Sequence, residues 1–500
     1  MNNDEIKHSS GNPLPPHPDN HLSEDDKAII DRKLVWRLDL TIIPWKRKGL
    51  KLNEYKNKQL CLLYLLAFLD RSNIGNAKVD GIKESLHLST TQFNMTLSVF
   101  FVSYSIVEPF TNVLLKRMNP SIFIPIIIVG WGLCMTFMGF VSNWSGLMAA
   151  RWFLGLAEAG LFPGINYYLS CWYKRSELGI RAAIFFSSAA VSGSFGGLLA
   201  FAIAKMEGLG NRPSWAWLFI LEGIITIIIG IISFWVIQDF PENAKFLSAE
   251  DRIRVIRRLK AEKQSSADHE DFKIKYFWMA IKDYKMWLGM AIFAGTDMPL
   301  YAFSLFLPSI ISELGYSMTS AQLLTVPPYA VAAILTVLVG WIADRTHQRG
   351  LCNIFTSIIG ITGFVMLIAF QRPEVKYAGT FLAALGIYPC IPNSISWISN
   401  NVEGSYKRGI VLGFVIGWGN LNGIISSNIY SEKSGYIVGH VTIIGFLSVF
   451  LLGGSLLMRY LLQRENRIRK KGERDYWLAD LDDSALEDMG DARPDFFYTL

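Results

Sequence analysis

Charged residues are scarce in this chain, at 18% of its 500 residues, whereas hydrophobic residues reach 51%. A soluble globular domain has about 25% charged residues, so this balance argues against an ordinary soluble enzyme. The net charge of +6 does not indicate a nucleic-acid partner, because most of it lies in segments that flank long apolar runs. The composition therefore favours a chain that is embedded in a lipid bilayer.

Cysteine is also rare in the sequence. The five cysteines include no Cys-x-x-Cys pair and no cluster with histidine, which predicts neither a zinc site nor a disulfide framework. A nucleophile paired with a general base is missing too, so we expect no enzyme activity and no cofactor. The N-terminal segment is polar and lacks a signal-peptide pattern, and the first apolar run is expected to direct membrane insertion.

Long apolar runs are what the sequence has in abundance. A hydrocarbon core of about 30 Å is crossed by about 20 helical residues, and twelve runs reach that length. We place them near residues 58–78, 90–114, 122–142, 146–170, 181–204, 215–237, 286–311, 321–343, 351–370, 376–398, 409–430 and 437–461. The sequence therefore predicts an all-α membrane protein with twelve transmembrane helices.

A single long connection, residues 238–284, divides these runs into two equal groups. Two halves of similar length indicate a parallel duplication, which predicts two six-helix bundles. The basic residues of the connection and the tails favour the cytosolic side for all three. We therefore expect the following division: a cytosolic N-terminal tail with an interfacial helix (1–57), a first bundle (58–237), a cytosolic linker (238–284), a second bundle (285–462) and a cytosolic C-terminal tail (463–500).

Charged residues inside the apolar runs point to a functional site. Arg151 and Glu158 are two helical turns apart on one helix face, about 10 Å, which is too far for a direct ion pair. Each must find a partner on another helix or in water, either in a structural ion pair or on a path for an ion or ligand. Asp70 enters the membrane from the opposite side and reaches the same depth of about 18 Å as Glu158. Two carboxyls at the midplane favour a substrate and ion site.

Polar residues in the second half extend this picture. Asp297 interrupts the seventh run next to a proline, and Tyr301 lies one turn further on the same face. Asn393 and Trp397 of the tenth run either line a cavity for a planar polar ligand or hold helices together. Glu222 of the sixth run is more simply explained by a structural partner.

The stretch from Gly340 to Arg349 resembles the loop motif of the major facilitator superfamily, Gly-x-x-x-Asp-Arg-x-x-x-Arg. Residues 70–76, Glu108 with Asn112, and residues 151–164 resemble the anion:cation symporter family. They are most similar to its fungal branch, which includes permeases for allantoate, nicotinate, pantothenate and biotin. Residues 215–223 and 321–329 fit the same branch.

The resemblance implies roles for individual residues. Asp70 and Glu158 would handle the proton, and Arg71 would hold a substrate carboxylate. Together with the polar residues above, the substrate site would comprise Arg71, Asn73, Arg151, Asp297, Tyr301, Asn393 and Trp397. The cytoplasmic gate would comprise Glu108, Asn112, Lys116, Arg117, Asp344, Arg345 and Arg349. This chain departs from the family pattern after Glu108, where Pro-Phe-Thr-Asn replaces the usual x-Pro-Ser-Asn.

These features lead us to expect a proton-coupled symporter that imports a small organic carboxylate, such as a nicotinate-like vitamin or an allantoate-like anion. The expected partners are this anion, a proton and the bilayer, with the protein acting as a monomer and binding no nucleic acid. A non-transporting nutrient sensor and a uniporter or exporter of an organic anion remain the alternatives. The resemblance places the protein in the plasma membrane with both termini cytosolic, the endoplasmic reticulum or another internal membrane being the alternative.

Overall fold

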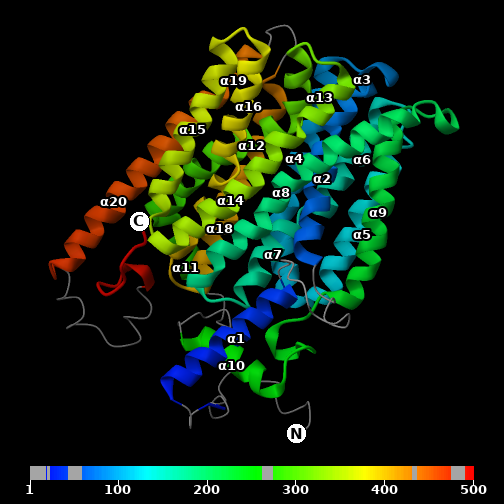
Figure 1. The fold of residues 1–500 in the computed structure, drawn as a ribbon. Coiled ribbons are helices and arrows are strands. Elements are labelled where there is room, and N and C mark those ends of the chain that lie inside the picture. The colour runs from blue at the N-terminus through cyan, green and yellow to red at the C-terminus, as the bar shows by residue number, and fades with distance from the viewer. Residues whose placement is uncertain (1–17, 20–22, 43–58, 262–273, 431–435, 474–489) are drawn as a thin grey trace.

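A computed structural model describes residues 18–19, 23–42, 59–261, 274–430, 436–473 and 490–500. All secondary-structure elements in these ranges are helices, and the long helices run side by side (Figure 1). Nine helices or joined helix pairs among the described residues are long and apolar enough to cross a membrane. The prediction of an all-α membrane protein is confirmed.

Six helical rods make up the first half, and their bounds follow the predicted spans closely. They are α2 (Gln59–Val79), α4 (Thr90–Arg117), α5 (Pro120–Met138), α6 (Trp144–Glu158) with α7 (Leu161–Ser170), α8 (Arg175–Ile203) and α9 (Ser214–Val236). A single turn, α3 (Ile82–Ser85), follows α2.

Six further rods make up the second half. They are α12 (Tyr284–Glu313), α13 (Met318–Leu324) with α14 (Val326–Thr346), α15 (Arg349–Ala369), α16 (Pro373–Ile387) with α17 (Cys390–Asn400), α18 (Ser405–Asn428), and α19 (Ile437–Gly445), which continues through a π-helical stretch (Phe446–Gly453) into α20 (Gly454–Lys470). Together the two halves give the twelve transmembrane helices that the sequence predicts.

The break between α6 and α7 lies directly after Glu158. A Cβ atom on Gly160 would stand 3.1 Å from the Phe123 ring and 3.1 Å from Thr111, so this turn packs without a side chain. Pro163 lies in the first turn of α7, where a proline fits because its missing N–H has no partner in the helix. The break therefore places Glu158 at the end of a helix, deep in the protein.

Small residues let the two halves approach each other closely. A Cβ atom on Gly75 of α2 would overlap the backbone of Leu305 in α12. Gly193 of α8 lies directly against the ring of Tyr329 in α14, and Gly423 of α18 lies against Phe101 in α4. Close contact of this kind is how helices associate inside a bilayer, where burial of apolar surface supplies no driving force.

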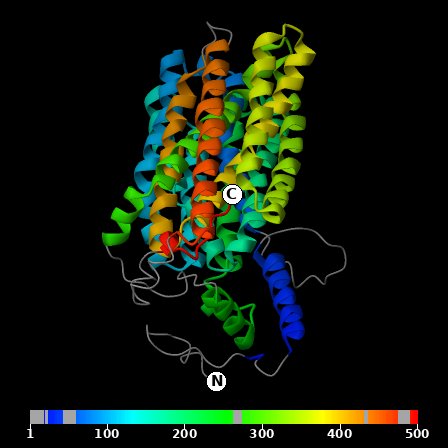
Figure 2. The same ribbon diagram turned by 90° about the vertical axis from the view of Figure 1, so that its left-hand side faces the viewer.

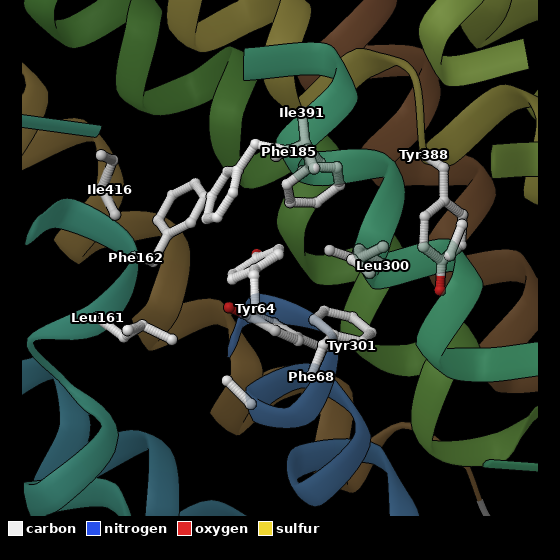
Figure 3. Close-up of a cluster of buried hydrophobic side chains, with 14 of the residues drawn as sticks. Tyr64, Phe68, Leu161, Phe162, Phe185, Leu300, Tyr301, Tyr388, Ile391 and Ile416 are labelled. Carbon is white, nitrogen blue, oxygen red and sulfur yellow. The ribbon is translucent and has the colours of Figure 1, made fainter. Parts of the chain in front are cut away.

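An aromatic cluster fills the space where the two halves meet (Figure 3). The ring of Tyr64 in α2 lies 4.4 Å from that of Phe185 in α8 and 5.5 Å from that of Phe162 in α7. Leu300 of α12 and Ile391 of α17 approach the same cluster from the second half.

Two helices stand outside the bundle, α1 (Glu24–Ile42) and α10 (Ala249–Ala261), and they lie beside each other in both views (Figures 1 and 2). Arg37 of α1 pairs with Asp251 of α10 at 2.9 Å. Arg181 of α8 pairs with Asp39 of α1 at 2.6 Å, which ties the pair to the bundle. In the sequence, α11 (Ile274–Lys282) follows α10 and precedes the second half.

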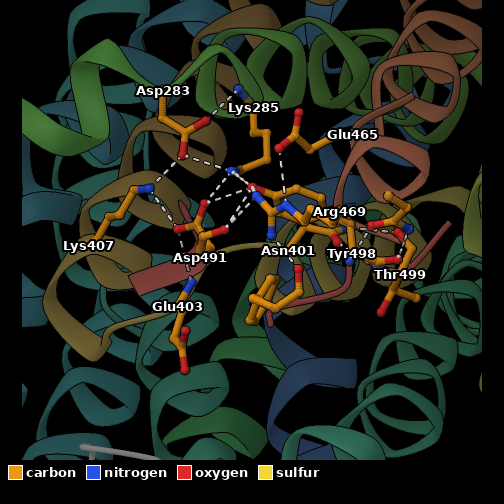
Figure 4. Close-up of polar contacts among 12 residues, drawn as sticks. Asp283, Lys285, Asn401, Glu403, Lys407, Glu465, Arg469, Asp491, Tyr498 and Thr499 are labelled. Atoms are coloured by element: carbon orange, nitrogen blue, oxygen red, sulfur yellow. Dashed lines mark hydrogen bonds and ion pairs between the residues drawn. The ribbon is translucent and has the colours of Figure 1, made fainter. Parts of the chain in front are cut away.

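Residues 490–500, which we call the strap, fold back onto the second half (Figure 4). Asn466 of α20 donates to the Tyr498 carbonyl at 2.8 Å and accepts from the Tyr498 amide at 2.9 Å. Asn401 holds the backbone of Thr499 in the same two-point way, at 2.9 and 2.8 Å. Two asparagine side chains thus clamp successive backbone units, whatever side chains those units carry.

Asp491 anchors the other end of the strap. It pairs with Lys407 of α18 at 2.7 Å and with Lys285 of α12, and Asp283 contacts the same two lysines. Burial opposes ionisation of Asp491, but the ammonium groups of Lys285 and Lys407 hold its pKa below the ordinary value.

Asp491→Asn is expected to detach the strap, because it leaves two buried ammonium groups with one carboxylate. Breaking a buried ion pair typically costs about 3–5 kcal/mol. Hydrogen exchange of residues 490–500 should therefore accelerate, while Asp495→Asn, at an exposed carboxylate beside Arg493, leaves it unchanged. Because the pKa of Asp491 is lowered in the folded protein, the strap of the unmodified protein should stay protected from hydrogen exchange above a pH of about 4. This protection should be lost as the pH falls further and Asp491 becomes protonated. Equal exchange in both variants would contradict the anchor role.

Candidate functional site

Arg71 of α2 joins the two halves of the protein at mid-depth. Its Nη2 and Nε atoms donate to one oxygen of Glu158, at 2.6 and 3.1 Å, and its Nη1 atom donates to the Tyr301 hydroxyl of α12 at 2.9 Å. The residue is 7% exposed and Glu158 only 1%. The predicted partner of Glu158 on another helix is therefore Arg71.

Aromatic rings surround the Arg71 guanidinium. Its central carbon lies 4.9 Å from the centre of the Tyr104 ring, 5.4 Å from Phe100 and 5.5 Å from Tyr301. The ring faces attract the cation, and their exclusion of water strengthens every charge interaction inside. The arrangement forms a cationic centre with flat apolar walls.

Arg151 lies against the same ring system. Its guanidinium is fully buried, 4.9 Å from the centre of the Phe100 ring, and no described residue accepts a hydrogen bond from any of its three nitrogens. The second carboxyl oxygen of Glu158 also lacks a hydrogen-bond partner there. Among the described residues Glu158 pairs with Arg71 and not with Arg151, and the centre has capacity for one more anion, because a buried cation without a partner is costly.

A chain of hydrogen bonds continues from Arg71 into the second half and back. Tyr301 donates to the Asn420 side-chain oxygen at 2.6 Å, and the Asn420 amide donates to Glu108 at 2.8 Å. Asn420 belongs to α18 and Glu108 to α4, so the chain crosses between the halves twice. A change of charge at Glu158 or Arg71 can therefore reach contacts that hold the halves together.

Asp70 faces a different neighbourhood from Arg71, because consecutive helical residues point about 100° apart. Its carboxyl accepts from the indole N–H of Trp131 at 3.0 Å and from the Thr226 hydroxyl at 3.3 Å. Asn73, one turn further along α2, donates to Glu222 of α9. Both acids are buried, at 0% and 1% exposure.

The structure brings some predicted ligand-binding residues together and separates others. Arg71, Arg151 and Tyr301 meet at the cationic centre. Asp297 is buried on the same helix as Tyr301, and its carboxyl lies against Gly419 of α18. Asn393 instead donates to the Arg349 carbonyl and to Asn353, both at 2.8 Å, and Trp397 donates to the Thr499 carbonyl of the strap at 3.0 Å. Neither of these last two contacts Arg71.

The predicted gate residues also divide. Asp344 accepts from the backbone amide of Ile180 at 2.5 Å and pairs with Arg349, which joins α14 and α15 to the first turns of α8. Arg345 lies 5.3 Å over the Trp341 ring. Glu108 belongs to the central hydrogen-bond chain. The side chains of the remaining three, Asn112, Lys116 and Arg117, fall outside the described part of the structure.

Sequence reasoning did not assign roles to several residues of this site. Their residue types are common in membrane spans: Phe100, Tyr104 and Trp131 are aromatic, and Thr226 is small and uncharged. The signal for Trp131 was available, since its indole N–H inside a span needs an acceptor. Within the described ranges, no group of three or more histidine, cysteine or acidic side chains is arranged to hold a metal.

Comparisons with known proteins agree with this architecture. Residues 60–427 match the family model of the Major Facilitator Superfamily. An uncharacterized transporter of Schizosaccharomyces pombe is 36% identical over 483 residues, 96% of this chain and 92% of its own. The high-affinity nicotinic acid transporter of Saccharomyces cerevisiae is 30% identical, covering 92% of this chain and 81% of its own.

A solved structure shares the fold. It is a bacterial homolog of the human lysosomal transporter Spinster in an inward-facing and occupied conformation, with a TM-score of 0.58 and 16% identity, covering 79% of this chain and 94% of that one.

Proposed function

The chain belongs to the major facilitator superfamily, and we propose that it is a proton-coupled symporter that imports a small organic carboxylate by alternating access of its two halves. One observation carries the proposal. The fully buried Arg151 guanidinium has no hydrogen-bond acceptor among the described residues, and it shares the Phe100 ring with Arg71. A carboxylate ligand would supply the anion that these two cations lack.

The coupling follows from competition for Arg71. In the present arrangement Glu158 occupies two of its donors. A proton on Glu158 removes that negative charge and frees the guanidinium fork, whose geometry can hold both oxygens of a substrate carboxylate. Proton and anion then bind together as a neutral pair, which lowers the cost of enclosing them. Tyr301 and Asn420 would transmit the change to the contacts between the halves.

The substrate we propose first is a nicotinate-like anion, with an allantoate-like anion second. The flat rings of Phe100 and Tyr104 beside Arg71 suit a planar molecule with one carboxylate. The relative from S. cerevisiae is named as a nicotinic acid transporter. We further propose that the protein works as a monomer in the plasma membrane with both termini in the cytosol.

The test is uptake of labelled nicotinate into proteoliposomes under an imposed pH gradient, acidic outside. A symporter accumulates the label above the outside concentration, and collapse of the gradient with a protonophore abolishes the excess. Allantoate, pantothenate, biotin and dipeptides serve as unlabelled competitors to rank the substrates. Equilibration without accumulation would indicate a uniporter, and binding without uptake a sensor; either result contradicts the proposal.

A further inference from the structure

Two buried acids, Asp70 and Glu222, lie at the contact between α2 and α9, and each accepts a hydrogen bond from the opposite helix. Asp70 of α2 accepts from Thr226 of α9 at 3.3 Å, and Glu222 of α9 accepts from Asn73 of α2. Residues 70 and 73 are one helical turn apart, as are 222 and 226. Each acid therefore accepts a hydrogen bond from a residue on the opposite helix, one turn away from the other acid. This arrangement brings the two carboxyls side by side and within electrostatic range.

The groups around this carboxyl pair are neutral donors. They are the indole of Trp131 from α5, the Thr226 hydroxyl and the Asn73 amide. From α8 the neighbour is Gly196, whose Cβ position is 3.0 Å from the Asn73 oxygen.

Among the described residues, the charged neighbour of the pair is a third acid, and no cation forms an ion pair with either member. Arg71, the cation beside Asp70 on α2, is bonded to Glu158 and Tyr301, and neither acid of the pair forms an ion pair with a described residue. Glu158 of α6 is the further acid within electrostatic range of Asp70. One oxygen of Asp70 and one of Glu222 are buried without a hydrogen-bond partner among the described residues.

Two adjacent carboxylates without a cation cannot both stay ionised in a water-excluded interior. Such a pair holds a proton between its two members, and its titration belongs to the pair rather than to either residue. We propose that Asp70 and Glu222 bind the transported proton jointly, so that Glu222 is a second member of the proton site. This inference rests on the proposed proton-coupled transport and assigns a role to an acid that a structural partner alone would otherwise explain.

The transfer steps balance within this group of acids. A proton taken up by the pair sits on Asp70 or Glu222, and it moves on when its O–H bond to Asp70 breaks and an O–H bond to Glu158 forms. Asp70 and Glu222 are then briefly both anions and Glu158 is neutral, and the repulsion between the two anions favours uptake of the next proton by the pair. Loss of the Glu158 charge releases Arg71 for the substrate, as the coupling requires.

The experiment measures the pH at which uptake into proteoliposomes is half-maximal, in three variants. Glu222→Gln removes the repelling neighbour, so Asp70 is easier to ionise and the midpoint should move about one unit or more toward acid. Thr226→Val removes a donor that favours the anion of Asp70, so the midpoint should move toward alkaline pH. Ser233→Ala is the control, because this buried hydroxyl on the same helix donates to the Ile229 carbonyl instead. A purely structural role for Glu222 would lower uptake at every pH and leave the midpoint in place.

Infrared spectra over a pH titration of the purified protein give a readout that does not need transport. Glu222→Gln should remove one protonated-carboxyl band and shift another, whereas Ser233→Ala should change neither. An unchanged midpoint together with an unchanged band for the second carboxyl would overturn the inference while leaving symport intact. If the unmodified protein shows no pH-driven accumulation, the proposed function fails, and the infrared titration alone decides whether the pair shares a proton.

Discussion

Arg71→Lys is expected to lower the affinity for the carboxylate substrate by about two orders of magnitude, without loss of membrane insertion. Lysine keeps the charge but has no planar fork, so it cannot hold both carboxylate oxygens and the Tyr301 hydroxyl together. Charge-assisted hydrogen bonds contribute about 1.5–3 kcal/mol each, which converts to the expected factor. The measurement is the concentration dependence of substrate binding in detergent and of uptake in proteoliposomes.

Arg212→Lys is the matched control, since Arg212 packs over Phe140 away from the cationic centre. It should leave affinity unchanged. Arg151→Lys separates the two candidate cations, because Arg151 has no internal acceptor to lose among the described residues. If Arg71→Lys binds the substrate as well as the unmodified protein while Arg151→Lys does not, then Arg151 holds the anion and Arg71 serves Glu158 alone.

Glu158→Gln should abolish uphill accumulation and preserve exchange of substrate across the membrane. The amide is neutral like the protonated acid, so Arg71 stays available for the substrate, but no proton can be carried or released at this position. Counterflow measures exchange, and uptake driven by a pH gradient measures coupling. We expect counterflow within a few-fold of the unmodified protein and pH-driven accumulation near background.

Glu250→Gln provides the comparison, because this carboxylate is exposed on α10 and pairs only at the surface with Arg254. It should retain both activities. Accumulation by Glu158→Gln at the level of the unmodified protein would make Glu158 a structural partner of Arg71 and remove it from the coupling path. Partial accumulation would instead assign part of the proton to Asp70 and Glu222.

The sequence predicted the helical rods well because length and hydropathy alone decide whether a segment can cross a bilayer. It also singled out Arg151 and Glu158, since charges at that depth are costly and need a reason, and the family resemblance added Arg71. It could not say which charge meets which. Asp70 and Arg71 are adjacent in sequence, yet one faces Trp131 and the other Glu158, and that choice depends on how α2 is rotated against α5, α6 and α9.

Asn393 and Trp397 illustrate a second limit. A polar residue in a span either lines a site or joins helices, and the pattern is the same in both cases. The structure uses Asn393 to hold α15 and Trp397 to hold the strap. The strap itself follows an acidic, polar tail, and its attachment depends on Asn401 and Asn466, which are far from it in sequence. No local periodicity reports such contacts.

The strap has a practical consequence for labelling the protein. The carbonyl of Leu500 accepts from the backbone amide of Gly350 in α15 at 3.3 Å, so a fluorescent reporter fused directly after Leu500 would begin against the helix bundle. A folded reporter domain at that position would clash with the helices next to the strap and could displace the strap from Asn401 and Asn466. A flexible spacer of about ten residues, spanning roughly 15–20 Å on average, would hold the reporter away from the bundle and leave the strap bound to its helices.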